Sequence, residues 1–149
     1  MESVEPGKLS FSEAKAAGNA AFKSGDYTTA VSAYSAGIAA QRQPILSGAD
    51  DKDQAATLWA NRALAHAKAE QWGLSLRASE CALLCDACHS KATFRQATAY
   101  MKLGLGRAAC HALKLGLSRI PEDDVDARGV WRTALAEASE VREREVQMM

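Results

Sequence analysis

Cysteine and histidine side chains cluster in the middle of the chain, at a spacing that suggests haem or metal chemistry. Cys85, Cys88 and His89 fit the C-x-x-C-H pattern by which c-type haem is attached. Cys81 completes a set of four ligands of the types that zinc prefers. Haem attachment requires export, and MESVEPGKLS lacks the basic start and apolar run of a signal peptide. Because C-x3-C-x2-C-H is also an unfamiliar zinc spacing, we expect no metal and no cofactor, with zinc as the lesser alternative.

Lysine, arginine and asparagine side chains recur at helical spacing. Lys15 and Asn19 are four residues apart, as are Lys91 and Arg95, so each pair lies on one face of a helix. Asn61 precedes Arg95 by 34 residues. Cations form charge-assisted bonds with carboxylates, arginine can bind them bidentately, and asparagine amides donate to carboxylate or backbone oxygens. The set therefore suits a peptide's free C-terminal carboxylate together with an acidic side chain.

Composition favours helices as the elements that position these residues. Of 149 residues, 31 are Ala, whereas the strand-forming residues Val and Ile together number nine. The formal net charge is zero, so no global field attracts nucleic acid or an anionic membrane. No apolar run approaches the length of a membrane span. We expect a cytoplasmic protein, with the nucleus as a second location, and reduced cysteines.

Capping and stop signals divide the chain into short helices. Ser10 and Glu13 form a capping box before the first helix, which Gly25 ends, and Asp26 can cap the second. The segment 41–54 contains Pro, Gly and three Asp and is expected to be a loop or a frayed helix end. The other expected helices cover residues 55–70, 72–84 and 107–119, with one between them that starts at residue 90 and stops near Gly104 or Gly106. A last helix has an apolar stripe at Trp131, Leu135, Ala138 and Val141.

The first six helices form three pairs with equivalent positions. Small residues recur in the first helix of each pair and again in the second, at Gly18, Ala63 and Ala97, and at Ala30, Ser75 and Ala109. The last two pairs are 34 residues apart, the period of the tetratricopeptide repeat, and the first two are 45 apart because of the 41–54 segment. Tyr34, Tyr100 and Pro121 fall at further positions of the repeat, whereas His66 and Ser79 depart from its aromatic positions.

The predicted fold is an all-α solenoid of three helix hairpins plus a C-terminal capping helix, which covers the last exposed apolar face. The expected divisions are an N-terminal extension at 1–10, three repeats within 11–120 (about 11–44, 56–89 and 90–121, with an inserted loop at about 41–54), and a capping helix and tail at 122–149.

Three segments, KAAGNAAF, ANRALAHAK and KATFRQA, resemble the signature segments of carboxylate-clamp tetratricopeptide domains from heat-shock-chaperone adaptors. That family binds the C-terminal Glu-Glu-Val-Asp tails of the cytosolic heat shock proteins 90 and 70. Its clamp pattern is K-x-x-x-N, N and K-x-x-x-R in the three repeats. The resemblance implies that the clamp consists of Lys15, Asn19, Asn61, Lys91 and Arg95. It also implies that Phe22 flanks the pocket for an apolar residue of the tail.

The expected function is that of a non-enzymatic co-chaperone or adaptor that binds such a tail. Cys110 and His111 are adjacent in a helix, so their side chains point about 100° apart and form no nucleophile–base pair. We expect no catalytic residues, no nucleic-acid partner and no membrane partner. A general scaffold for another peptide, or the targeting domain of a larger enzyme, stays open as an alternative. The preferred chaperone and the oligomeric state are left open.

Overall fold

The computed structural model describes residues 9–40 and 49–148, and these residues form seven helices and no strand. Residues 1–8 of the predicted N-terminal extension (1–10) and residues 41–48 of the predicted inserted loop (about 41–54) lie outside the described residues, whereas residues 49–54 are helical. The helices are α1 (Phe11–Lys23), α2 (Tyr27–Ala40), α3 (Ala49–Lys68), α4 (Trp72–Cys85), α5 (Ser90–Lys102), α6 (Gly106–Ser118) and α7 (Val125–Gln147).

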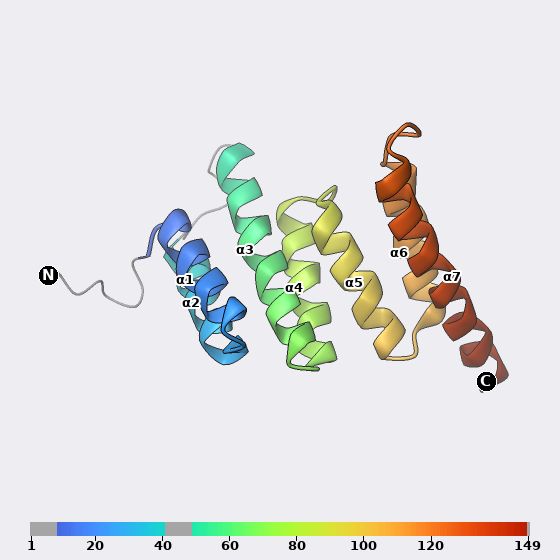
Figure 1. Ribbon diagram of the computed structural model, residues 1–149. Coiled ribbons are helices and arrows are strands. Elements are labelled where there is room, and N and C mark those ends of the chain that lie inside the picture. The colour runs from blue at the N-terminus through green and yellow to red at the C-terminus, as the bar shows by residue number, and fades with distance from the viewer. Residues whose placement is uncertain (1–8, 41–48, 149) are drawn as a thin grey trace, which may run out of the picture.

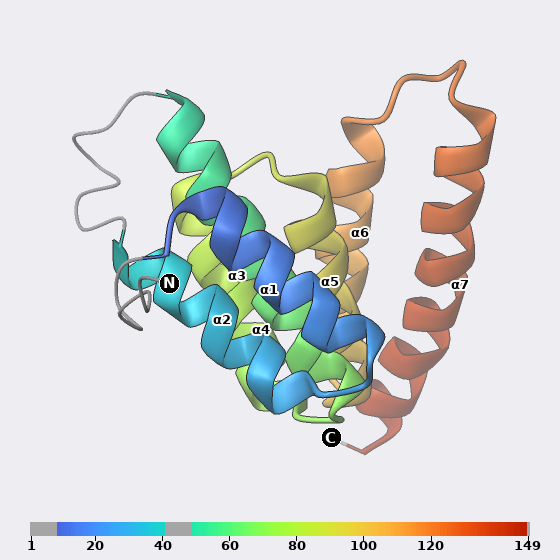
Figure 2. The same ribbon diagram turned by 60° about the vertical axis from the view of Figure 1, so that its left-hand side comes forward.

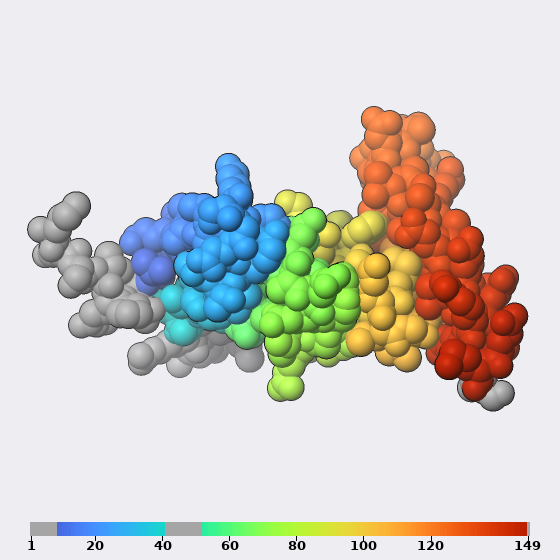
Figure 3. Space-filling view, turned by 60° about the horizontal axis from the view of Figure 1, so that its bottom comes forward, coloured from blue at the N-terminus to red at the C-terminus, as the bar shows by residue number. Residues whose placement is uncertain are grey.

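The helices are stacked as antiparallel pairs, each of which packs on the next. Helices α1, α3, α5 and α7 form one layer, while α2, α4 and α6 lie behind them (Figures 1 and 2). The space-filling view shows an elongated molecule in which the segments follow one another in chain order from α1 to α7 (Figure 3). The predicted all-α solenoid of three hairpins and a further helix is thereby confirmed.

The predicted capping signals define the ends of the first two helices. The backbone N–H of Glu13 donates to Ser10 Oγ at 3.2 Å, and that hydroxyl donates in turn to Glu13 Oε1 at 2.9 Å. Gly25 has a φ of +81° and reverses the chain after α1. Asp26 then accepts from the backbone N–H of Thr29 at 3.1 Å and caps α2. Local sequence is therefore sufficient to place the first turn between layers.

One helix boundary differs from expectation, and the end of α5 falls at one of its two expected stops. Helix α3 begins at Ala49, six residues before the predicted start at Ala55. The three Asp residues near this start favour a helical first turn, because negative charge stabilises a helix N-terminus. Gly104, at a φ of +78°, ends α5, whereas Gly106 is the buried first residue of α6. Gly104 therefore ends one helix, and Gly106, two residues later, allows the next helix to pack closely on its neighbour.

Small residues bring the layers into close contact. The Tyr34 ring lies over Gly18, where a Cβ atom would be 2.2 Å from Tyr34 Cε1. In the second repeat, buried Ser75 donates to the backbone oxygen of Ala63 at 2.8 Å. Ser79, which replaces the aromatic residue there, is fully buried and donates to the carbonyl of its own helix. The core is thus made of many alanines and a few large side chains.

Helix α7 packs on α6 and covers the third repeat. Trp131 is buried against Gly116, where a Cβ would be 2.1 Å from the indole ring, and its ring centre is 5.1 Å from that of Phe94. Gly106 lies against the backbone of α7 at Arg142. Among the helices in the described part of the chain, none combines the length and apolar character that crossing a membrane requires.

Candidate peptide-binding groove

Lys15 and Asn19 lie one turn apart on α1. Lys15 is exposed, with Nζ 5.6 Å from the ring centre of Phe11, and Asn19 is half-buried. Asn19 Oδ1 accepts a 2.6 Å hydrogen bond from the hydroxyl of Tyr34 on α2. Burial raises the pKa of Tyr34, so the hydroxyl keeps its proton and remains a donor at neutral pH. The bond directs the amide oxygen toward the second layer and leaves the Asn19 amide hydrogens for a ligand.

Asn61 is half-buried on α3, and its side chain forms no hydrogen bond with any described residue. The neighbouring Arg62 is engaged within the fold. Its Nη1 donates to Ser35 Oγ on α2 at 2.9 Å, and its guanidinium carbon lies 5.2 Å from the ring centre of Trp59. Asn61 is therefore the side chain of this pair that remains available for a partner.

Lys91 and Arg95 lie one turn apart on α5. Lys91 is exposed and Arg95 is half-buried. Neither side chain forms an ion pair or a hydrogen bond with a described residue. Burial lowers the pKa of Arg95, yet a guanidinium remains charged at neutral pH because its ordinary pKa is far higher. The third repeat thus presents one exposed cation and one partly desolvated cation, both without a counter-charge in the described chain.

The three helices that carry these residues are neighbours in the first layer. Helix α3 contacts both α1 and α5 (Figures 1 and 2). Asn61 is therefore on the helix between the Lys15–Asn19 pair and the Lys91–Arg95 pair. All five predicted residues belong to this layer, and none belongs to α2, α4 or α6. The curvature of a repeat solenoid creates an extended concave surface, which we expect on this layer of first helices.

Phe22 lies near the end of α1 and packs within the first hairpin. Its ring is half-buried and meets the ring of Tyr27 edge to face, with centres 5.4 Å apart. This contact fixes the ring at the junction of α1 and α2. The predicted contact of Phe22 with an apolar peptide residue stays a prediction.

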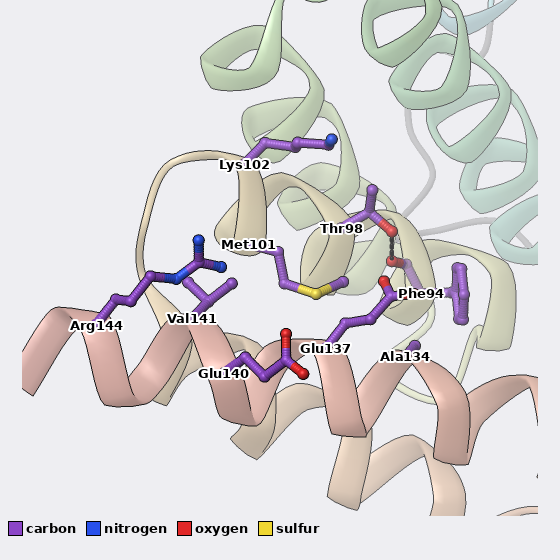
Figure 4. Close-up of a pocket in the computed structure, with 9 residues that line it drawn as sticks. All are labelled: Phe94, Thr98, Met101, Lys102, Ala134, Glu137, Glu140, Val141 and Arg144. Atoms are coloured by element: carbon purple, nitrogen blue, oxygen red, sulfur yellow. Dashed lines mark hydrogen bonds between the residues drawn. The ribbon is translucent and has the colours of Figure 1, made fainter.

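A cleft between α5 and α7 is a feature that sequence reasoning missed. It has a volume of about 490 Å³ and is lined on both sides by apolar and charged side chains (Figure 4). Phe94 and Met101 contribute from α5, while Glu137, Glu140 and Val141 contribute from α7. Phe94 and Met101 are seven residues apart, so they lie on one face of α5, next to the face that carries Lys91 and Arg95. This spacing is the signal that could have indicated the cleft.

The cysteine cluster lies in α4 and the turn that follows it. Cys81 and Cys85 are half-buried in α4, and Cys88 is exposed in the turn. His89 caps α5, because its Nδ1 accepts from the backbone N–H of Ala92 at 3.2 Å. Within residues 9–40 and 49–148, no group of three or more His, Cys, Asp or Glu side chains is arranged to hold a metal ion.

Known structures share this architecture. No protein-family model matches the chain. The second TPR domain of human RPAP3, solved in complex with the HSP70 peptide SGPTIEEVD, is 31% identical with a TM-score of 0.66. That match covers 87% of this chain and 92% of the human domain. The TPR2B domain of yeast Sti1, solved in its pHsp70 complex, is 26% identical with a TM-score of 0.72, over 87% of this chain and 96% of that one.

A third structure shows the same fold at lower identity. The first TPR of Spaghetti (RPAP3), bound to the HSP90 peptide SRMEEVD, is 21% identical with a TM-score of 0.72, over 91% of this chain and 99% of that one. The shared helix order, and the 31% identity to the human domain over most of both chains, assign this chain to the family of tetratricopeptide-repeat domains.

Proposed function

We propose that this chain is a protein-interaction module that binds the acidic C-terminal tail of heat shock protein 90 or 70. The observation that carries the proposal is Arg95, a half-buried cation on α5 with no acidic partner in the described chain. Removing a charge from water is unfavourable unless an opposite charge or hydrogen-bond acceptors replace the water. A carboxylate on a bound peptide supplies both.

The other predicted clamp residues supply the matching donors. Lys15 and Lys91 add exposed positive charge at the two ends of the set. Asn19, oriented by Tyr34, and the unpartnered Asn61 offer neutral amide donors. Two cationic ends with amides between them suit a ligand that carries a terminal carboxylate and a nearby acidic side chain, as Glu-Glu-Val-Asp does. Phe22 is proposed to contact the apolar residue of this tail.

Structures of related domains with such peptides support the proposal, at 31% identity for the human domain and 26% for the yeast domain. These relatives are interaction domains rather than enzymes. The adjacent Cys110 and His111 also differ in environment, because Cys110 is buried whereas His111 is exposed. We therefore propose a binding role in the cytoplasm or nucleus, where the chaperones are found, and no catalytic role.

Peptide binding tests the proposal directly. SGPTIEEVD with a free carboxyl terminus is expected to bind with a Kd on the micromolar scale, about −8 kcal/mol. A C-terminal amide, or the variant Lys91→Ala, should weaken binding at least tenfold, because each removes one partner of a charge-assisted contact. Lys114→Ala is the matched control, since Lys114 is exposed on α6 in the other layer. Equal affinity for the acid and amide forms would instead favour a general scaffold that binds an internal peptide.

A further inference from the structure

The cleft between α5 and α7 continues toward the beginning of α7. A second hollow of about 520 Å³ adjoins the first and shares Phe94, Ala134 and Glu137 with it. Its remaining lining consists of Gly129, Val130 and Thr133. Among the described residues that line this part, Glu137 is the one ionisable side chain. This second part of the cleft therefore combines an aromatic and aliphatic lining with a single carboxylate.

The Glu137 carboxylate has no partner in the described chain. Both Glu137 and Glu140 are exposed, and neither forms an ion pair or a hydrogen bond with a described residue. Figure 4 shows the Glu137 side chain extending from α7 toward Phe94 on α5, whereas the Glu140 carboxylate stays close to α7. The two cations of the cleft lie nearer its other end, on Lys102 and Arg144. Lys102 is already engaged, because its Nζ is 5.5 Å from the ring centre of Trp72.

The cleft is continuous with the proposed clamp. Phe94 precedes Arg95 in sequence, and Thr98, which lines the cleft, lies one turn after Arg95. Neighbouring helix axes are about 10 Å apart, so the cleft, which lies beyond α5, is about 15 Å from α3 and about 25 Å from α1. Five to six extended residues span about 17–20 Å. A peptide whose last residue is held at the clamp can therefore place its fifth or sixth residue from the end in the cleft.

We propose that this cleft binds a basic side chain, arginine above all, that lies about five residues before the acidic end of the partner peptide. The chemistry of the side chains that line the cleft indicates which side chain of the peptide it binds. An arginine side chain has an aliphatic stem and a planar cation, which fit an apolar wall at Phe94 and a carboxylate at Glu137. Glu137 would repel an acidic side chain beside it, and a purely apolar side chain would gain no charge contact with it. This inference rests on the proposed function, because the clamp sets the register of the peptide.

Paired peptides and variants test the inference. SRMEEVD carries an arginine at the fifth position before its last residue, and SAMEEVD is its matched control. The unmodified protein is expected to bind SRMEEVD about two- to fivefold more tightly at low ionic strength, the range for a partly exposed ion pair. Glu137→Gln should remove this preference while SAMEEVD binds at least as tightly as it does to the unmodified protein, because a negative charge near an acidic peptide has been removed. Glu143→Gln, a change of an exposed residue on α7 that does not line the cleft, should retain it.

The outcomes separate the two proposals. If both peptides bind with micromolar Kd and equal affinity, or if Glu137→Gln leaves the preference intact, the assignment of the cleft is overturned and the clamp stands. If neither these two peptides nor SGPTIEEVD binds, the proposed function is overturned and this inference with it. If SGPTIEEVD alone binds, this inference is overturned and the clamp stands. A preference that disappears in Glu137→Gln and persists in Glu143→Gln supports the assignment.

Discussion

The hydroxyl of Tyr34 on α2 donates a 2.6 Å hydrogen bond to Oδ1 of Asn19 on α1. The Tyr34 ring is only 2% exposed and lies directly over Gly18, so its position is fixed by the core of the first hairpin. Tyr34, a core residue of the second layer, thereby holds the oxygen of the Asn19 amide and leaves its nitrogen free to face a ligand. The repeat fold and the proposed clamp are coupled at this residue pair.

Tyr34→Phe should weaken peptide binding about fivefold, because loss of a hydrogen bond of about 1 kcal/mol frees the Asn19 amide to rotate. The aromatic ring and its packing on Gly18 are retained, so unfolding should change by no more than about 1.5 kcal/mol. Fluorescence anisotropy with a labelled SGPTIEEVD peptide measures the affinity. Tyr27→Phe is the control, because the Tyr27 hydroxyl bonds no described residue. Equal affinity of the two variants would show that Asn19 does not depend on Tyr34.

Gly106→Ala should destabilise the protein by about 1–3 kcal/mol through overpacking. An added Cβ would lie 2.1 Å from the backbone nitrogen of Arg142, and backbone atoms cannot rotate away as a side chain can. Gly129→Ala is the matched control on α7, where nothing lies within 4 Å of the new methyl group. That change should stabilise by about 0.5–1 kcal/mol through helix propensity. Urea unfolding measures both variants, and a change of the same sign in both would contradict the close docking of α7.

The repeat register was predictable because it depends on local and periodic signals. Gly18, Ala63 and Ala97 are all buried, as the equivalence of their positions requires. The start of α3 was misplaced because turn-forming residues and acidic residues favourable to a helix start occur together in that segment. Sequence alone therefore predicts the elements better than their ends.

The cleft and the Tyr34–Asn19 bond were not predicted, for a different reason. A cleft between α5 and α7 depends on how far two helices diverge, which is set by side-chain packing rather than by spacing along either helix. Tyr34 was assigned to the repeat pattern, but its hydroxyl partner is on another helix, 15 residues earlier. Such contacts follow from the three-dimensional arrangement and have no local signature.

Asp26 should titrate below pH 3.8 in the folded protein. The Thr29 hydroxyl donates to its carboxylate at 2.6 Å, and the Thr29 backbone N–H donates at 3.1 Å, so both bonds lower the pKa of Asp26. Because the folded pKa is depressed, this cap stabilises α2 above the unfolded value of 3.8 and is lost as the pH falls through the folded pKa. An NMR titration of the carboxyl carbon measures it. Thr29→Val should raise the pKa, and a midpoint at or above 3.8 before mutation would contradict the cap.

Arg95→Met should have opposite effects on the free protein and on binding. The half-buried guanidinium loses hydration and gains no acceptor among the described residues. Its desolvation therefore lowers the stability of the peptide-free protein. Methionine keeps an unbranched side chain and a good helix propensity. We therefore expect the free energy of unfolding to rise by about 0.5–1 kcal/mol, while peptide affinity falls at least tenfold.

The control for this variant is Lys91→Met. Because Lys91 is exposed, its replacement should lower peptide affinity without changing the free energy of unfolding by more than about 0.5 kcal/mol. Urea unfolding and SGPTIEEVD titration of both variants provide the comparison. If Arg95→Met lowers stability, then Arg95 contributes to the fold of the free protein, and its lack of a partner no longer indicates a ligand. If stability rises while binding is lost, the Arg95 guanidinium destabilises the free protein, and its contribution is to bind the carboxylate of the peptide.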